Sequence, residues 1–256
     1  MGKVVAFSNQ KGGVGKTSTC VNMAASLALR GYKVLLVDID AQGNSTTGMG
    51  IAKNTLVRSI YNVLIDQTYI SDVIIPTSIE GLDILPSNID LAGAEVELVY
   101  LKNREKRLRM ALESVKNKYD YVMIDCPPSL NLLTINALTA SDAVIIPIQC
   151  EFFAVEGLTK LLNTINLVVK STNKFLTVGG IVLTMNDNRP LVSKQIQAEL
   201  RQYFGSKVFN TVIPRNIRVS EAPSHGKPVI IYDPKSKGAK SYVELTTEFL
   251  QREAKQ

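Results

Sequence analysis

The chain lacks most of the features that build disulfide-stabilised, metal-binding or membrane-spanning proteins. It has three cysteines in 256 residues, far apart and without a C-x-x-C pair, which argues against disulfide, zinc and iron–sulfur sites. Its one histidine, His225, has no cysteine or acidic cluster beside it, so we expect no metal-ligand role for it. No apolar run approaches the roughly 20 residues needed to cross a bilayer, and Met1-Gly2-Lys3 shows no signal-peptide pattern. These absences favour a cytoplasmic protein without a membrane partner.

No Pro-, Gly- or Ser-rich linker divides the chain, and 45% of its residues are apolar. We therefore expect residues 1–256 to form a single domain with a sizeable core. The charge is uneven: residues 187–256 carry 12 Lys and Arg against 7 Asp and Glu, within a total net charge of +6. This asymmetry predicts a polyanion-binding face near that end, although ordinary solvated lysines explain it equally well.

A glycine-rich loop is the strongest motif. KGGVGKT at residues 11–17 follows an apolar run at residues 4–7 and opens a helical pattern that continues to Arg30. Glycines let consecutive backbone N–H groups face one bowl, and the positive end of the next helix favours an anion there. Lysine supplies a charge for the β- and γ-phosphates, and the following hydroxyl is suited to bind magnesium. The predicted phosphate-binding residues are Lys11, Gly12, Gly13, Val14, Gly15, Lys16, Thr17 and Ser18.

The loop departs from the general G-x-x-x-x-G-K-[ST] pattern at two positions. Gln10 replaces the first glycine, and Lys11 is a second lysine. Lys16 already serves its own bowl, so the long cationic chain of Lys11 is better placed to reach a γ-phosphate held by another copy of the protein. This is the pattern of the deviant Walker A ATPases.

Acidic residues end two further apolar runs. Asp38 and Asp40 follow residues 34–37, and Asp125 ends the run that begins at Tyr121. The carboxyl ends of parallel strands are where α/β sheets bind ligands, so we expect these acids near the glycine loop. Asp125 has the Walker B position, in which the acid supports the magnesium shell. For Asp40 a capped turn remains an alternative.

The rest of the chain alternates between strands and helices. Strands are predicted at residues 82–86, 143–148, 178–184 and 209–213, and a final helix at residues 238–253. A basic run at residues 102–109 is interpreted as a solvated helix face in preference to a binding site. The N-K-x-D signature of guanine binding is absent, because Leu176 stands where its acid should be, so adenine is favoured. Pro214 and Asn216 could hold the purine, although a plain turn explains them equally well.

Together these motifs resemble the ParA/Soj chromosome- and plasmid-partitioning ATPases of the ParA/MinD superfamily. The resemblance covers nearly the whole chain, with two mild departures at Ser18 and Ala41, where threonine and proline are usual. The matching stretches are KGGVGKT at 11–17, DIDAQGN at 38–44, YDYVMIDCPPSL at 119–130, LTINALTASD at 133–142, VIPRN at 212–216 and SEAPSHGKP at 220–228.

The resemblance implies an α/β fold, a doubly wound, mostly parallel β-sheet with helices on both faces. It also implies ATP and Mg²⁺ as cofactors and an ATP-dependent sandwich homodimer. Lys11, Lys16 and Asp40 are then the catalytic residues: Lys11 crosses to the partner's nucleotide and Asp40 sets up the attacking water. Thr17 and Asp125 serve the magnesium, while Pro214 and Asn216 hold adenine.

The resemblance further implies partners. The ATP-bound dimer would bind double-stranded DNA without sequence preference, and Arg189 and Arg218 match DNA-contacting arginines of the family. A ParB-type centromere-binding protein would stimulate hydrolysis and release the dimer from DNA, which associates the protein with the nucleoid. Regulation of replication initiation through DnaA is a further family role.

Three rival functions remain open. An iron–sulfur carrier or other metabolic ATPase on the same fold would need paired cysteines. A MinD-like positioning ATPase would need a terminal basic amphipathic helix. A nucleotide-switched DNA-binding scaffold with negligible hydrolysis contradicts nothing in the sequence.

Overall fold

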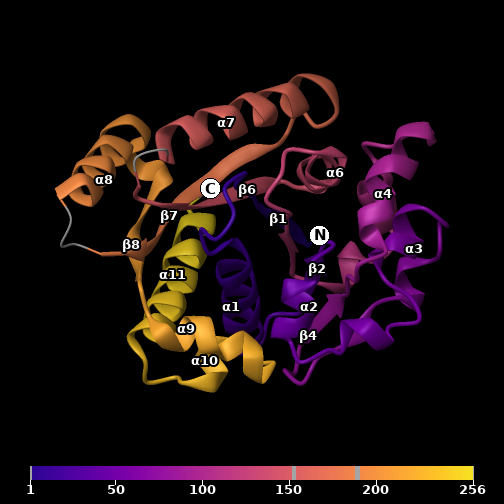
Figure 1. Cartoon of the computed structure of the whole chain (residues 1–256), viewed down its shortest axis with the longest axis horizontal. Helices are drawn as coiled ribbons and strands as arrows, with labels where there is room; N and C mark the ends of the chain where they lie inside the picture. The colour runs from indigo at the N-terminus through magenta and orange to yellow at the C-terminus, as the bar shows by residue number, and fades with distance from the viewer. Residues whose placement is uncertain (1, 152–153, 188–190, 256) are drawn as a thin grey trace.

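A mostly parallel sheet runs through the centre of the molecule (Figure 1). The structure, a computed structural model, describes residues 2–151, 154–187 and 191–255. Eight strands follow the order β3-β4-β2-β5-β1-β6-β7-β8, and only β3 pairs antiparallel with its neighbour. The strands are β1 Lys3–Phe7, β2 Val34–Asp38, β3 Ile75–Pro76, β4 Leu82–Leu85, β5 Tyr121–Asp125, β6 Ala143–Gln149, β7 Thr177–Asn186 and β8 Val208–Pro214.

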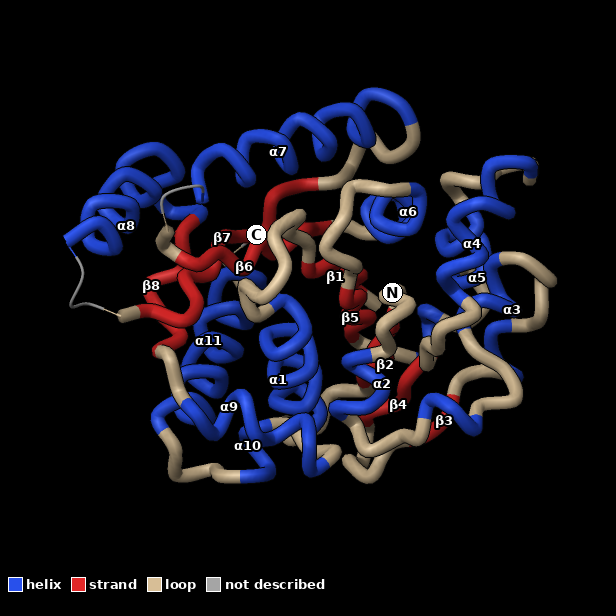
Figure 2. The backbone as a smooth tube through the Cα atoms, viewed as in Figure 1, coloured by secondary structure: helices blue, strands red, loops and turns tan. Residues whose placement is uncertain are grey.

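Both faces of the sheet are buried, because side chains alternate along each strand. Val4 and Ala6 of β1 join one apolar cluster, which α3 to α8 cover. Val5 and Phe7 join the other, which α1, α10 and α11 cover. Figure 2 shows the strands between these two groups of helices. The expectation of a doubly wound α/β sheet with helices on both faces is thereby confirmed.

The longer helices are α1 Lys16–Ala28, α4 Leu91–Glu97, α6 Leu132–Ala140, α7 Ala154–Ser171, α8 Leu191–Phe204 and α11 Lys237–Glu253. The shorter ones are α2 Asn44–Gly48, α3 Ile60–Leu64, α5 Arg107–Leu112, α9 Ile217–Glu221 and α10 Val229–Tyr232. Short 3₁₀ turns are η1 Lys53–Thr55, η2 Ile70–Asp72, η3 Leu98–Tyr100, η4 Lys116–Lys118, η5 Gly205–Lys207 and η6 Ala222–His225.

The strands predicted at residues 82–86, 143–148, 178–184 and 209–213 and the final helix lie close to the expected bounds, whereas α8 and other elements were not predicted. The basic run is not one helix face, because α5 begins only at Arg107 and residues 101–106 form turns. The two-residue strand β3 was not predicted, since an antiparallel edge pair of that length carries too little pattern to detect. No helix in the described ranges is long and apolar enough to span a membrane.

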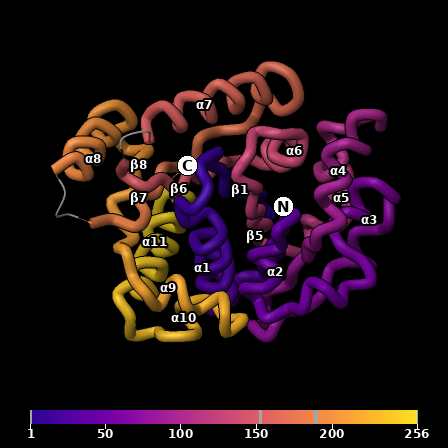
Figure 3. The backbone as a smooth tube through the Cα atoms, in the orientation of Figure 1, coloured from indigo at the N-terminus to yellow at the C-terminus, as the bar shows by residue number. Residues whose placement is uncertain are grey.

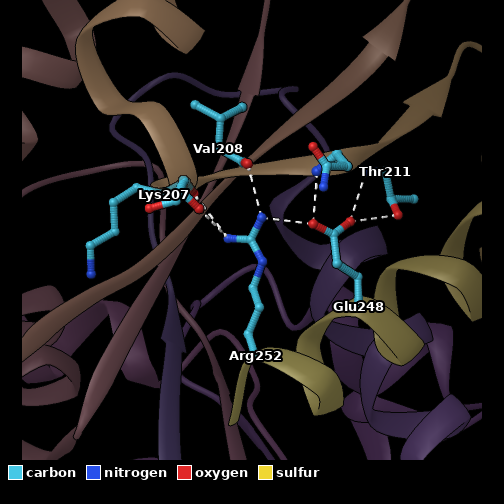
Figure 4. A network of polar contacts seen from close by, with 7 residues as sticks. Lys207, Val208, Thr211, Glu248 and Arg252 are labelled. Carbon is cyan, nitrogen blue, oxygen red and sulfur yellow. Dashed lines mark hydrogen bonds and ion pairs between the residues drawn. The ribbon is translucent and has the colours of Figure 1, made fainter. Parts of the chain in front are cut away.

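The last helix is fastened to the edge strand β8 by the network in Figure 4. Glu248 of α11 accepts hydrogen bonds from the backbone N–H groups of Asn210 and Thr211, both at 2.8 Å. Arg252 pairs with Glu248 at 2.7 Å, donates to the carbonyl of Val208 at 2.9 Å, and lies 4.0 Å from the ring centre of Phe209. Glu248 thus satisfies donors that an edge strand would otherwise expose.

Candidate functional site

Three strand ends meet at one level of the sheet. Asp125 at the end of β5 pairs in register with Phe7 of β1 on one side and with Asp38 of β2 on the other. From β1 the sheet extends in both directions, toward β2 and β4 and toward β6 and β7. Ligands of open α/β sheets bind at this kind of reversal in strand order, and the glycine loop leaves the sheet there.

The loop at residues 8–15 is shaped by glycine and fixed at both sides. Gly13 and Gly15 have φ of 72° and 81°, in the left-handed region that glycine tolerates. Gly15 is also the N-cap of α1, so the N-terminal end of that 13-residue helix faces the bowl. Asn9 Nδ2 donates to the carbonyl of Pro147 at 2.8 Å, and Thr184 Oγ1 donates to that of Val14 at 2.7 Å.

Lys16 lies folded over the loop with only 6% of its surface exposed. Its Nζ donates to the carbonyl of Lys11 at 3.3 Å. Burial lowers the pKa of Lys16, while the negative charges of Asp125 and Asp40 oppose that shift. A triphosphate would supply the anionic partner that this buried ammonium needs to remain charged.

The environment of Asp125 fits a magnesium ion. Ser45 Oγ donates to Asp125 Oδ2 at 2.7 Å, whereas the buried Oδ1 has no hydrogen-bond partner in the described parts of the chain. Burial raises the pKa of Asp125 above its usual range, and the neighbouring Ser45 and Thr17 side chains oppose that shift. An orphaned carboxylate oxygen beside a hydroxyl suits a hard cation. No cluster of three or more His, Cys, Asp or Glu that could hold a metal exists among the described residues, so phosphate and water would complete its shell.

Asp38 and Asp40 are held by short local contacts. Asp38 Oδ2 accepts from both the N–H and the hydroxyl of Thr46 at 2.8 Å, and burial beside Asp125 raises its pKa. Asp40 Oδ1 accepts from the N–H of Gln42 at 2.9 Å, so the capped-turn alternative describes part of its geometry. Within the described ranges no hydrogen bond engages Asp40 Oδ2, which leaves one oxygen able to accept from water.

Lys11 points away from its own phosphate bowl. Its Nζ forms an ion pair with Glu151, which follows β6, and the two side chains are 38% and 49% exposed. Its backbone N–H donates to Asn9 Oδ1 at 3.0 Å, which fixes the base of the side chain. Lys11 therefore adds no charge to the loop that carries it.

A cavity of about 410 Å³ opens beside the loop, between β7, β8 and α11. Pro214 and Asn216 lie on its wall together with Gly15 and Ser18 of the loop region. Asn216 Oδ1 caps α9 by accepting from the N–H of Arg218 at 3.0 Å. Volume and position match a heterocyclic base attached to phosphates on the loop. The described residues that line the cavity are Gly15, Ser18, Thr184, Met185, Ile213, Pro214, Arg215, Asn216, Ile217, Val219, Ser220 and Tyr242.

The segment that carries Asp40 touches the segment that borders this cavity. Figure 3 shows α2 and α10, which are far apart in the sequence, in neighbouring positions. A Cβ added to Gly226 would lie 2.6 Å from the Cα of Gly50, so only glycine permits this approach. Asn22 Oδ1 of α1 also accepts from the N–H of Ile230 at 3.3 Å.

Of the two arginines predicted to contact DNA, the structure describes only Arg218. Arg218 is half exposed and forms ion pairs with Glu221 at 2.8 Å and Asp233 at 3.4 Å. Arg189 lies outside the described residues, so the pair cannot be assembled into one surface.

Several residues of the site were not predicted from the sequence. Ser45 and Thr46 anchor Asp125 and Asp38, and Thr184 anchors the loop, yet isolated hydroxyls in a turn or strand carry no motif. Met185 has a φ of 49°, a left-handed value unusual for this residue, and lines the 410 Å³ cavity. The only hint in the sequence is that Met185 directly follows the strand predicted at residues 178–184, where ligand-binding residues of such sheets lie.

Comparison with known proteins shows which family the chain resembles. A family described as "AAA domain" matches residues 2–178. The chain is 57% identical over 248 residues to "Sporulation initiation inhibitor protein Soj" of Bacillus subtilis strain 168, covering 97% of this chain and 98% of the relative. It is 50% identical over 253 residues to "Chromosome partitioning protein ParA" of Caulobacter vibrioides strain NA1000 / CB15N, covering 98% and 95%.

Solved structures agree in fold. A Mycobacterium smegmatis protein titled cobyrinic acid a,c-diamide synthase, with bound ADP and magnesium, matches with a TM-score of 0.87 and 38% identity over 99% of this chain and 96% of that one. A putative plasmid partition protein from Borrelia burgdorferi bound to AMPPNP matches with a TM-score of 0.82 and 26% identity over 100% and 99%.

Proposed function

The chain belongs to the ParA/Soj family of chromosome-partitioning ATPases, and from that premise we propose a DNA-partitioning cycle driven by its own nucleotide site. It is an ATPase that uses ATP with Mg²⁺ and forms ADP and phosphate. One arrangement supports this proposal most strongly. The glycine loop, Lys16, Thr17 and Asp125 come together where β1, β2 and β5 end at the same level, and the Lys11 side chain points away from its own phosphate bowl.

In this proposal the phosphates occupy the bowl formed by residues 11–18 and the adenine occupies the cavity beside Pro214 and Asn216. Thr17 and Asp125 hold the magnesium, whose charge offsets the phosphate oxygens when it is bound. Lys16 neutralises the β- and γ-phosphates from within the subunit. Lys11 leaves Glu151 and reaches the nucleotide of a second copy, so ATP binding and homodimer formation become one event.

Asp40 orients the attacking water and does not remove its proton in advance. A carboxylate is a far weaker base than hydroxide, so removing the proton of water fully before the attack would be strongly unfavourable. The phosphoryl transition state is loose, so positioning and neutralisation of charge are sufficient. The oxygen of Asp40 that Gln42 does not engage is available for this contact.

The dimer would bind double-stranded DNA without sequence preference through Arg189, Arg218 and other basic residues near the end of the chain. A ParB-type protein would stimulate hydrolysis and release the dimer, DnaA would be a further partner, and DNA binding would place the protein on the nucleoid. We also propose that residues 1–256 act as a single P-loop ATPase domain, which the shared sheet supports.

The rival functions receive less support. A metabolic role is suggested by the solved structure titled cobyrinic acid a,c-diamide synthase, which is 38% identical to this chain. The relatives that are 50% and 57% identical carry the names ParA and Soj. A MinD-like membrane role would need a free apolar helix face, but Tyr242, Leu245 and Phe249 of α11 are buried in the core. A DNA-binding scaffold with negligible hydrolysis is separated by the experiment below.

The test measures ATP turnover with and without DNA and a ParB-type protein. The wild-type chain should turn over slowly alone and faster with both. Lys11→Ala should bind ATP but lose dimerisation and turnover, and Asp40→Ala should bind ATP and dimerise without turnover. Full activity of a dimeric Lys11→Ala variant would refute the exchange of Lys11 between subunits, and normal turnover by Asp40→Ala would remove its assignment.

A further inference from the structure

A second cavity, of about 420 Å³, lies between α3, η2 and α5, and it shares no lining residue with the cavity beside the glycine loop. Figures 2 and 3 show α3 and α5 together at the side of the molecule opposite α8. Two chain segments form it, residues 63–70 and residues 102–114. The proposed ATPase cycle assigns it no role.

The cavity has an apolar floor and a polar rim. Val63 and Ile70 on its wall are buried in the core, while Tyr69 and Met110 are largely exposed. Thr68, Ser114, Gln67 and Asn103 contribute hydroxyl and amide groups around them. An apolar body with a few converging polar groups is the ordinary composition of a small-molecule site, and the volume lies within the roughly 300–1,000 Å³ typical of such sites.

Its charge has one sign. Lys102 and Arg107 line the cavity, and none of the described residues on its wall is acidic. Lys102 makes no hydrogen bond or ion pair with any described residue. Arg107 donates only through Nη1, to the carbonyls of Leu64 and Ile65 at 2.8 and 3.4 Å, and its buried Nε has no acceptor within the described chain. The guanidinium is therefore held by neutral carbonyls, and no ion pair with a described residue offsets its charge.

The two loops at the rim both contain a backbone outlier. Gln67 has a φ of 58° and Asn103 a φ of 54°, so two of the three non-glycine residues with positive φ in the described chain line this one cavity. Left-handed conformations of non-glycine residues are unfavourable and concentrate at ligand clamps. The positive φ angles of Gln67 and Asn103 are thus a second feature, besides the unpaired basic groups, that points to a ligand site here.

We propose that this cavity binds a small organic anion, a phosphate-, sulfonate- or carboxylate-bearing molecule with an apolar body. The anionic group meets Lys102 and Arg107, and the body lies over Ile70 beside Met110. A protein partner would need about 800 Å² of surface on each side, far more than this cavity provides, so a small ligand is the better match.

The probe for the test is 8-anilinonaphthalene-1-sulfonate, which joins one sulfonate to an apolar aromatic body. It is titrated by calorimetry into the full-length protein saturated with ADP and Mg²⁺, so that the nucleotide site is closed to it. We expect one site per chain. N-phenyl-1-naphthylamine, the same body without the sulfonate, should bind about tenfold more weakly, because it cannot make the charge-assisted contacts.

Two matched variants locate the site. Lys102→Glu should weaken binding of the sulfonate probe by about tenfold or more, whereas Lys106→Glu makes the same charge change at an exposed residue that does not line the cavity and should leave binding unaltered. Met110→Glu, which also changes an exposed residue, should act like Lys102→Glu. Unchanged thermal melting of all three excludes misfolding.

Several results would overturn the proposal: no binding of the probe below 1 mM, equal binding of the neutral analogue, or equal effects of Lys102→Glu and Lys106→Glu. Binding of a polyglutamate peptide without binding of the sulfonate would also overturn it, because it would identify an acidic protein segment as the occupant.

Discussion

The ion pair between Lys11 and Glu151 gives a sharp prediction about dimer formation. If Lys11 has to reach a nucleotide in a second subunit, Glu151 competes for it within its own subunit. Glu151→Gln keeps the size and polarity of the side chain but removes its charge. The variant should therefore dimerise with ATP at lower protein concentration than the wild-type chain.

The size of the effect follows from the exposure of the pair. The two side chains are 38% and 49% exposed, so water screens their attraction, and pairs of this kind contribute about 0.2–1 kcal/mol. Because each of the two subunits gives up one such pair, Glu151→Gln should favour the dimer by about 0.4–2 kcal/mol, which corresponds to a dissociation constant about two- to thirtyfold lower. Because salt screens exposed charges over a Debye length of about 10 Å at 0.1 M and about 3 Å at 1 M, the difference should shrink as salt is added.

Sedimentation equilibrium with a non-hydrolysable ATP analogue, at 0.1 M and 1 M salt, measures this. Glu156→Gln is the matched control, since Glu156 forms an exposed ion pair with Lys160 on α7 and does not contact Lys11. In a Lys11→Met background, Glu151→Gln should have no effect. Weaker dimerisation of Glu151→Gln, or an equal gain in the Lys11→Met background, would refute the competition between Glu151 and the second subunit.

Two further predictions follow from the described contacts, and a third follows from the proposed binding of DNA. Burial raises the pKa of Asp38 and Asp125, so the folded chain holds their protons more tightly than the unfolded chain. Nucleotide-free protein should therefore lose stability from pH 5 to pH 8, as pH rises through the raised values, and ADP with Mg²⁺ should reduce that loss in a calorimetric scan. Arg252→Met removes a partly buried ion pair and donors to β8, and should lower stability by about 2 kcal/mol, a fall in melting temperature of about 4–8 °C, whereas the exposed Lys255→Met should have little effect. Arg189→Ala and Arg218→Ala should each weaken binding of the ATP-bound protein to two unrelated duplexes alike and reduce the salt slope by about 0.9; loss confined to one sequence would contradict non-specific binding.

The central strands could be predicted from the sequence because each carries its own signal, whereas the doubly wound sheet was expected from the resemblance to the ParA/Soj family. Residues 4–7, 34–37 and 121–125 are apolar runs bounded by turn residues or acids, and both faces of a parallel sheet are buried, so hydrophobicity identifies them without ambiguity. The positions of Lys16, Thr17 and Asp125 then follow, because register between parallel strands brings their carboxyl ends to one edge.

The contacts that hold these groups could not be predicted. The pairing of Lys11 with Glu151 joins residues 140 positions apart and depends on where β6 ends relative to the loop. Ser45 and Thr46 act through single hydroxyls, and the residues around the 420 Å³ cavity combine a basic run with a loop that shows no pattern of its own. In each case the signal lies in tertiary geometry, which periodicity does not encode.

One such contact joins the segment near Asp40 to the segment near Arg218. The main chain at Gly50 and Gly226 is so close that a single added methyl group at Gly226 would overlap it. The first glycine follows the segment that carries Asp40, and the second follows the segment that carries Asn216 and Arg218. Because close-packed backbone resists compression, residues 43–50 cannot move closer to residues 216–228 at this point. A movement of residues 43–50 toward Gly226 on nucleotide binding would therefore push on the segment that carries Arg218, the proposed DNA contact.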